Sequence, residues 1–268
     1  MKRLLHLPML IGAVVSLFPF YWMIVAATNR TEDLFTSPPP FLPGGELLNN
    51  LARLEESVGF SRVAANSVGI AVVYTVLSSL LSAMCGYGLA KYRFRGRGLI
   101  LAVILGTMMI PFQVLLVPLF EMMAAFGWID TYQAVIVPFL ANAFGIFLMR
   151  QAFLDFPDEL IEAGRIDGCG EARIFYRIVL PAARPQLAAV VIFTFIAQWG
   201  AFLWPLLMLN SEDHYTIPVA LSTMVGLSKV DYSGLMLGSF AATLPIMAVF
   251  LFFQRQFISG LLGGSVKG

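Results

Sequence analysis

Charged residues are scarce in this sequence. Asp, Glu, Lys and Arg make up 12% of its 268 residues, whereas about 25% is usual in soluble domains. Hydrophobic residues make up 59%, and the mean hydropathy is +0.81. So few charges cannot cover the surface of a water-soluble protein of this size. We therefore expect an integral membrane protein.

Cysteine and histidine are also rare, with two residues of each type. Cys85 and Cys169 lie far apart in different kinds of segment, so neither a disulfide framework nor a metal site is expected. With only His6 and His214 available, we do not expect catalysis or metal binding by histidine. The net charge of +1 provides no surplus of basic residues for a nucleic acid.

Six intervals without charge mark candidate transmembrane helices, because ~20 apolar residues in a helix span a bilayer. The intervals are 4–29, 63–90, 98–120, 131–149, 185–211 and 232–254, with apolar cores at about 7–27, 66–89, 99–120, 132–149, 186–208 and 233–253. The first interval could be a cleaved signal peptide, but its length and the aromatic residues at 18–22 favour a retained helix. The sequence therefore predicts an all-α polytopic membrane protein with six transmembrane helices in a single domain, residues 1–268.

The distribution of Lys and Arg indicates how the spans are oriented. With a cytoplasmic N-terminus, 13 of the 17 basic residues lie on the inner side. The other four lie outside: Arg30, Arg53, Arg62 and Lys229. Both termini are therefore expected in the cytoplasm. The short basic loop at 91–98 is interpreted as a segment that sets this topology, with lipid or partner binding as the alternative.

The first outer loop, residues 28–62, combines a stiff turn with a short helix. Three successive prolines at 38–40 predict an extended, rigid segment. The amphipathic run near 50–60 predicts a helix that lies on the outer surface.

The central loop, residues 155–181, is the longest polar interval with helical patterning. Pro157 and the carboxylates around it predict a helix start, and Gly168 predicts its end. A second helix is expected from about Glu171 to Pro181, where proline ends the hydrogen-bond ladder. Gly164 lowers helix stability by ~1 kcal/mol relative to alanine, which indicates close approach to a partner surface. An ordinary solvated loop is the alternative.

The spacing of residues in this loop resembles the EAA loop of ABC importer permeases. The matching residues are Glu162-Ala163-Gly164, Gly168 after three further residues, and Ile178-Val179-Leu180-Pro181 after another nine. Gly164 stands where alanine is usual in that family. There the loop is a coupling helix that docks into a cleft on a cytoplasmic ATPase subunit. The resemblance implies these coupling residues: Glu162, Ala163, Gly164, Asp167, Gly168, Ile178, Leu180 and Pro181.

The resemblance extends along essentially the whole chain, and it is to the carbohydrate-uptake branch of the family. The chain is similar to the smaller maltose permease subunit of that branch. The segments 65–67, 90–94 and 260–268 carry this resemblance. The tail match implies ATPase contacts by these residues: Gly264, Val266, Lys267 and Gly268. The family often has Trp-Asn-Glu in the fifth span, where this chain has Trp199-Gly200-Ala201, so no polar sugar contact is carried over to that site.

The resemblance implies a permease subunit of an ATP-driven, binding-protein-dependent sugar importer in a bacterial or archaeal cytoplasmic membrane. The expected partners are a second permease, two ATPase subunits, an extracytoplasmic solute-binding protein, the sugar and membrane lipid. ATP and Mg are expected on the ATPase subunits, so this chain should hold no cofactor and should not be an enzyme. Its glycines at 164, 168 and 170 lack the Gly-Lys-Ser/Thr that completes a phosphate loop.

Polar residues within the spans are candidates for the solute pathway, because they are unfavourable in contact with lipid. The candidates are Gln113, Asn142, Gln198 and Tyr74, and hydrogen bonding between helices is the alternative for each. No carboxylate or lysine lies within a predicted span to form a proton relay, which disfavours an ion-coupled secondary carrier. Glycerol phosphate or another small solute remains an alternative cargo. A phosphate would require Arg or Lys, which the partner permease could provide.

Overall fold

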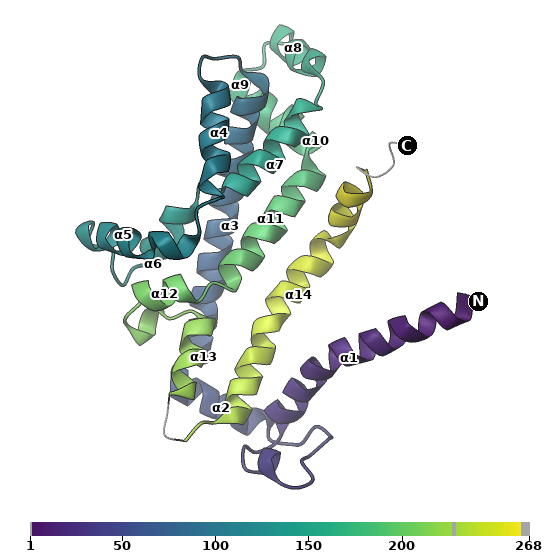
Figure 1. Cartoon of the computed structure of the whole chain (residues 1–268), viewed down its shortest axis with the longest axis vertical. Helices are drawn as coiled ribbons and strands as arrows, with labels where there is room; N and C mark the ends of the chain where they lie inside the picture. Colours follow the sequence, from purple (N-terminus) through teal and green to yellow (C-terminus); the bar gives the residue numbers. More distant parts are fainter. Residues whose placement is uncertain (1, 227–228, 264–268) are drawn as a thin grey trace. The chain divides into compact units, whose positions relative to one another are not determined.

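The computed structural model describes residues 2–226 and 229–263, with side chains for 8–226 and 229–254. Throughout these residues the regular structure is helical and contains no strand (Figure 1). The prediction of an all-α fold is confirmed. The chain forms two compact units, each described here by itself. Unit 1 contains residues 2–67 and 215–247, and unit 2 contains residues 68–214 and 248–263.

Unit 1 contains the N-terminal helix and the segments that pack near its end. Its helices are α1 (Lys2–Thr28), η1 (Asp33–Phe35), α2 (Leu47–Val58), α13 (Ile217–Val225), the first part of α3 (Phe60–Lys91) and most of α14 (Tyr232–Gly263). The helix predicted near 50–60 is confirmed as α2. Buried Asn50 on α2 donates from Nδ2 to the carbonyls of Ala27 and Asn29, at 2.7 and 2.9 Å. These bonds hold α2 against the end of α1.

Unit 2 contains the central loop and the helices that support it. Its helices are the rest of α3, α4 (Arg97–Thr107), α5 (Phe112–Ala125), α6 (Tyr132–Ile136), η2 (Val137–Phe139), α7 (Ala143–Leu154), α8 (Asp158–Ile166), α9 (Glu171–Ile174), the π-helical η3 (Phe175–Val179), α10 (Leu180–Ala182), α11 (Arg184–Trp199), α12 (Leu203–Met208) and η4 (Glu212–His214). Within this unit α8 lies at one end, whereas α5, α6 and α12 lie at the other (Figure 1).

Small residues let α3 and α7 cross closely in unit 2. A Cβ added at Gly86 on α3 would lie 2.7 Å from the backbone nitrogen of Arg150 on α7. A Cβ added at Gly145 on α7 would lie 2.6 Å from Oγ of Ser82 on α3. Ser82 and Gly86 are four residues apart, so they share one helix face, as small residues do where membrane helices pack.

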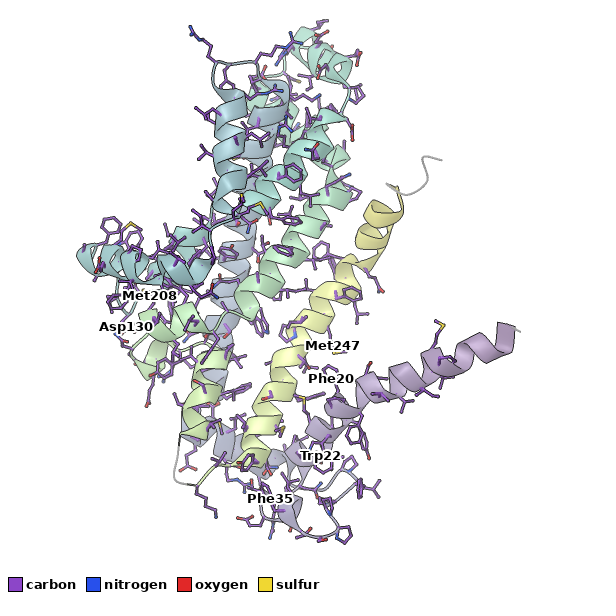
Figure 2. The ribbon with its side chains drawn as sticks, in the orientation of Figure 1. Phe20, Trp22, Phe35, Asp130, Met208 and Met247 are labelled. Carbon is purple, nitrogen blue, oxygen red and sulfur yellow. The ribbon has the colours of Figure 1, made fainter. Side chains whose placement is uncertain are left out.

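At the far end of unit 2, Asp130 joins two loops. Its backbone nitrogen donates to the carbonyl of Met208 at 2.7 Å (Figure 2). Its Oδ1 accepts from the backbone nitrogens of Asn210 and Ser211, at 2.9 and 3.0 Å. The segment between α5 and α6 is thereby tied to the segment after α12.

The structure offers as many candidate spans as the sequence predicted, but three of them are bent pairs of helices and not single helices. Within the described residues, three helices are long and apolar enough to cross a membrane: Pro8–Thr28, Phe60–Lys91 and Tyr232–Gln254. Three more candidates are bent pairs, α4 with α5 at 100°, Tyr132–Phe139 with α7 at 43°, and Glu171–Ala182 with α11 at 85°. Counting each pair as one span gives six. That each pair crosses as one span, in a single permease domain, stays a prediction.

Proline explains the sharpest of these bends. Helix α4 ends at Thr107, and α5 begins directly after Pro111. Proline donates no backbone hydrogen bond and disfavours helical geometry in the residue before it. The predicted apolar interval 98–120 is therefore two helices with a turn between them. At ~1.5 Å per residue, α4 alone is too short for a hydrocarbon core.

Candidate functional site

The central loop forms the predicted helix, glycine bend and helix. Helix α8 begins after Pro157 with two carboxylates in its first turn, which suits the positive end of the helix dipole. Gly168 follows the helix at φ +77°. Its nitrogen donates to the carbonyl of Arg165 at 3.0 Å, and the nitrogen of Cys169 donates to that of Gly164 at 2.9 Å. This bond pair is a Schellman motif, which requires the positive φ that glycine adopts readily.

One face of α8 is open to solvent. Glu162, Ala163, Ile166 and Asp167 are exposed, and Ile166 has an exposed fraction of 87%. Positions 162, 163 and 166 share this face, because residues three and four apart are neighbours on a helix. An isoleucine so exposed beside two carboxylates is a feature of interaction surfaces.

The opposite face of α8 packs against the chain's own second helix. Ile161 and Gly164 are buried there. A Cβ added at Gly164 would lie 3.0 Å from Cδ1 of Ile178 and 3.2 Å from Cγ1 of Ile174. The close approach that Gly164 indicated is therefore an approach to this chain's α9 and η3.

The predicted coupling residues thus fall into two groups. The exposed group consists of Glu162, Ala163, Asp167 and Gly168. The packed group consists of Gly164, Ile178, Leu180 and Pro181, which are buried or half-buried. The first group is available to a partner, and the second holds the first in place. The predicted tail residues lie outside the described residues: Gly264, Val266, Lys267 and Gly268.

An ion pair and a phenol fix the C-terminal end of α8. Arg165 and Glu171 form a salt bridge across the glycine bend, with Nε 2.7 Å from Oε1. Glu171 also accepts a hydrogen bond from Tyr92 at 2.5 Å. Hydrogen bonds from Arg165 and Tyr92 lower the pKa of Glu171. Burial, followed by the bond to Glu171, raises the pKa of Tyr92 to about 12. At neutral pH the phenol is therefore neutral and donates to an ionised carboxylate.

Unit 2 also contains a cavity of about 670 Å³, the second candidate site. Its lining residues are Tyr74, Thr107, Met108, Phe112, Val135, Pro138, Phe139, Ala141, Asn142, Ala143, Phe144, Phe193, Ala197, Gln198, Ala201, Trp204 and Pro205. Three of these form an aromatic cluster, in which the Phe112, Phe139 and Trp204 ring centroids lie 5.5–6.1 Å apart. No lining residue is charged. Apolar walls with a few polar groups are typical of small-molecule sites.

Three of the four predicted pathway residues line this cavity. Tyr74 donates from its hydroxyl to the carbonyl of Phe139 at 3.2 Å. Asn142 is the N-cap of α7, and its Oδ1 accepts from the nitrogen of Gly145 at 2.7 Å. Gln198 lines the wall contributed by α11. Asn142 therefore has a structural role in ending the bend before α7.

The sequence did not predict which residues of α5 face the cavity. Gln113 is exposed on α5 and does not line the cavity. Its neighbour Phe112 does line it. An aromatic residue that faces lipid and one that faces a cavity look the same in an apolar sequence. No signal in the sequence therefore marked the aromatic rings that line the cavity. At the fifth span, Ala201 lines the cavity, whereas Trp199 is buried and stacks on Phe195 at 5.6 Å.

Among the residues that the structure describes, no group of three or more His, Cys, Asp or Glu side chains could hold a metal ion.

A family model described as "Binding-protein-dependent transport system inner membrane component" matches residues 64–262. The lactose transport system permease protein LacG of Rhizobium radiobacter is 40% identical, over 96% of this chain and 93% of that protein. The arabinooligosaccharides transport system permease protein AraQ of Halalkalibacterium halodurans is 39% identical over the same shares. The sn-glycerol-3-phosphate transport system permease protein UgpE of Yersinia pestis is 33% identical, over 96% and 94%.

A solved structure has the same fold. It is the crystal structure of a bacterial ABC transporter involved in the import of the acidic polysaccharide alginate. One of its chains superposes with a TM-score of 0.83 over 96% of both chains, at 24% sequence identity.

Proposed function

This chain belongs to the family of binding-protein-dependent transport system inner membrane components, and we propose that it is the permease subunit that carries a neutral sugar or oligosaccharide in an ATP-driven importer. The chain itself is a transport subunit and not an enzyme. Its expected place is the cytoplasmic membrane, with both termini on the cytoplasmic side.

The cavity is the observation that carries the choice of solute. Its walls combine the rings of Phe112, Phe139 and Trp204 with the polar groups of Tyr74 and Gln198. Aromatic faces pack well against the C–H faces of sugars, while amide and hydroxyl groups hydrogen-bond their hydroxyls. The absence of charge on the lining residues favours a neutral solute. Two relatives named for lactose and arabinooligosaccharide transport support the same choice.

In this proposal α8 is the coupling helix. Its exposed face, with Glu162, Ala163 and Ile166, docks on a cytoplasmic ATPase subunit. Two such subunits would bind ATP and Mg, a second permease would complete the pathway, and an extracytoplasmic binding protein would deliver the sugar. The tail at 264–268 would add a further ATPase contact.

Glycerol phosphate is the second candidate solute, because one relative is named for its transport. A phosphate-bearing solute needs Arg or Lys within hydrogen-bond reach. No such residue lines the cavity, so the second permease would have to supply the cation. This requirement makes the sugar the better-supported cargo.

The test is uptake by the complete importer. The cognate solute-binding protein is first screened by thermal shift against lactose, arabinooligosaccharides and sn-glycerol-3-phosphate. The importer is then reconstituted in proteoliposomes, with ATP inside and the loaded binding protein outside. We expect ATP-dependent uptake of a sugar. Uptake of glycerol phosphate with no uptake of any sugar would contradict the proposal.

A further inference from the structure

The last residue of α3 contacts the start of α8. Lys91 donates from Nζ to the carbonyl of Phe156 at 2.5 Å and to Oδ1 of Asp158 at 2.6 Å. Its side chain is only 9% exposed. The bond from Lys91 lowers the pKa of Asp158, so this carboxyl stays ionised at neutral pH. A cation is therefore fixed where α8 begins.

The next residue contacts the other end of α8 through an intermediate. Tyr92 donates to Glu171 at 2.5 Å, and Glu171 pairs with Arg165 in the last turn of α8. The two ends of this nine-residue helix are thus linked to the last residue of α3 and to the residue that follows it.

A second group of aromatic rings packs around the end of α3. The ring of Tyr87, one turn before Lys91, lies 5.7 Å from that of Tyr92. It also lies 5.8 Å from the ring of Phe153 on α7 and 5.2 Å from that of Phe175 on η3. Such edge-on and tilted pairs stabilise packing beyond the apolar area that they bury. The end of α3 is therefore packed against α7 and η3 as well as bonded to the central loop.

We propose that Lys91 and Tyr92 are positioning residues that transmit displacement of α8 to α3 and so to the cavity. The inference rests on the proposed coupling role of α8. Because both ends of α8 are bonded to the end of α3, the helix cannot shift without straining these bonds or moving α3. The same helix carries Tyr74 on the cavity wall, ~26 Å away at helical rise.

This role differs from the one the basic loop was assigned from sequence. A loop that only sets topology needs positive charge and no particular contact. Arg95 fits that description, because it is exposed. Lys91 is nearly buried and makes two bonds to the loop that contains α8. Removing one charge at each position therefore separates the two roles.

The experiment compares Lys91→Met, Tyr92→Phe and the control Arg95→Met in the reconstituted importer. Uptake and ATP hydrolysis stimulated by the loaded binding protein are measured together, with ATPase co-purification as a check on assembly. We expect Lys91→Met to lower solute carried per ATP about tenfold, as for loss of one charge-assisted hydrogen bond. Tyr92→Phe should lower the ratio less, because Arg165 still pairs with Glu171. Arg95→Met should leave the ratio unchanged, and Lys91→Arg should keep most of it because the positive charge is retained.

Three results would overturn the inference. An unchanged transport-to-hydrolysis ratio in Lys91→Met, or an equal loss in Arg95→Met, would make the loop a topology signal. Failure of Lys91→Met to co-purify the ATPase would mean that the bond serves docking and not transmission. None of these results touches the coupling role proposed for α8, which is contradicted separately if Ala163→Trp on its exposed face leaves coupled uptake intact.

Discussion

Gly168 shows how one backbone position shapes the central loop. Its φ of +77° belongs to the left-handed region, which side chains with a Cβ rarely adopt. A Cβ added at this position would meet no atom within 4 Å. Any penalty of substitution is therefore conformational and not steric. For a β-branched residue we expect the left-handed geometry to raise the free energy of the loop by about 1–2 kcal/mol. Asparagine adopts this region more readily than most residues.

We therefore predict that Gly168→Val reduces sugar uptake about tenfold, while the matched variant Gly168→Asn keeps most of it. The measurement is uptake in proteoliposomes, with the amount of assembled complex determined in parallel. Equal uptake by both variants would show that the geometry of the bend is unimportant for coupling.

Two glutamines, one on the cavity wall and one outside it, test whether the cavity binds the sugar. Gln198 lines the cavity, whereas Gln113 is exposed on α5. Loss of one hydrogen bond to the sugar corresponds to about 0.5–1.5 kcal/mol, or roughly 2- to 13-fold in rate. We predict that Gln198→Leu lowers uptake at a fixed concentration of loaded binding protein by this factor, while Gln113→Leu does not. Loss of uptake in Gln113→Leu alone would place the pathway on the other side of α5.

At the scale of elements, the exposed face of α8 and the exposed surface of α9 should respond differently to a bulky side chain. Ala163 is on the exposed face of α8, and Ala172 is an exposed residue of α9. We predict that Ala163→Trp abolishes ATPase co-purification and uptake, because the indole holds α8 away from its docking surface. Ala172→Trp should do neither. Retained co-purification in Ala163→Trp would assign docking to another segment.

The same element shows what local sequence could predict. The bend and the first helix of the central loop followed from Pro157 and Gly168, because caps act within one turn. The second helix differs from the prediction: it runs past Pro181 to Ala182 and contains the π-helical η3. The direction in which Gly164 faces did not follow. It depends on Ile174 and Ile178, which return to α8 only after the chain has reversed at the bend.

At the scale of the whole molecule, the loops that the basic bias assigned to one side do meet within unit 2. Asp130, in the predicted outer loop before the fourth interval, bonds to Ser211 at the end of the fifth interval. Lys91 pairs with Asp158, and both lie in predicted inner loops. These contacts agree with the order of the spans and leave the absolute orientation to be measured.

We predict that single cysteines replacing Glu46 or Glu212 react with an impermeant thiol reagent on intact cells. Cysteines replacing Arg95 or Arg173 should react only after permeabilisation. The background variant has Cys85 and Cys169 replaced, since both are free thiols. Labelling of the Arg173 position from outside would reverse the proposed topology.

The sequence by itself determined the membrane class, the all-α fold, the six apolar intervals and the helix–bend–helix of the central loop. Each depends on composition or on neighbours within a turn or two, where burial in lipid and capping act. Only the tertiary structure decided that Phe112 and not Gln113 lines the cavity, that Asn142 caps α7, and that Lys91 holds α8. Helix rotation and long-range pairing decide these contacts, and an apolar helix carries no amphipathic pattern that would fix its rotation in advance.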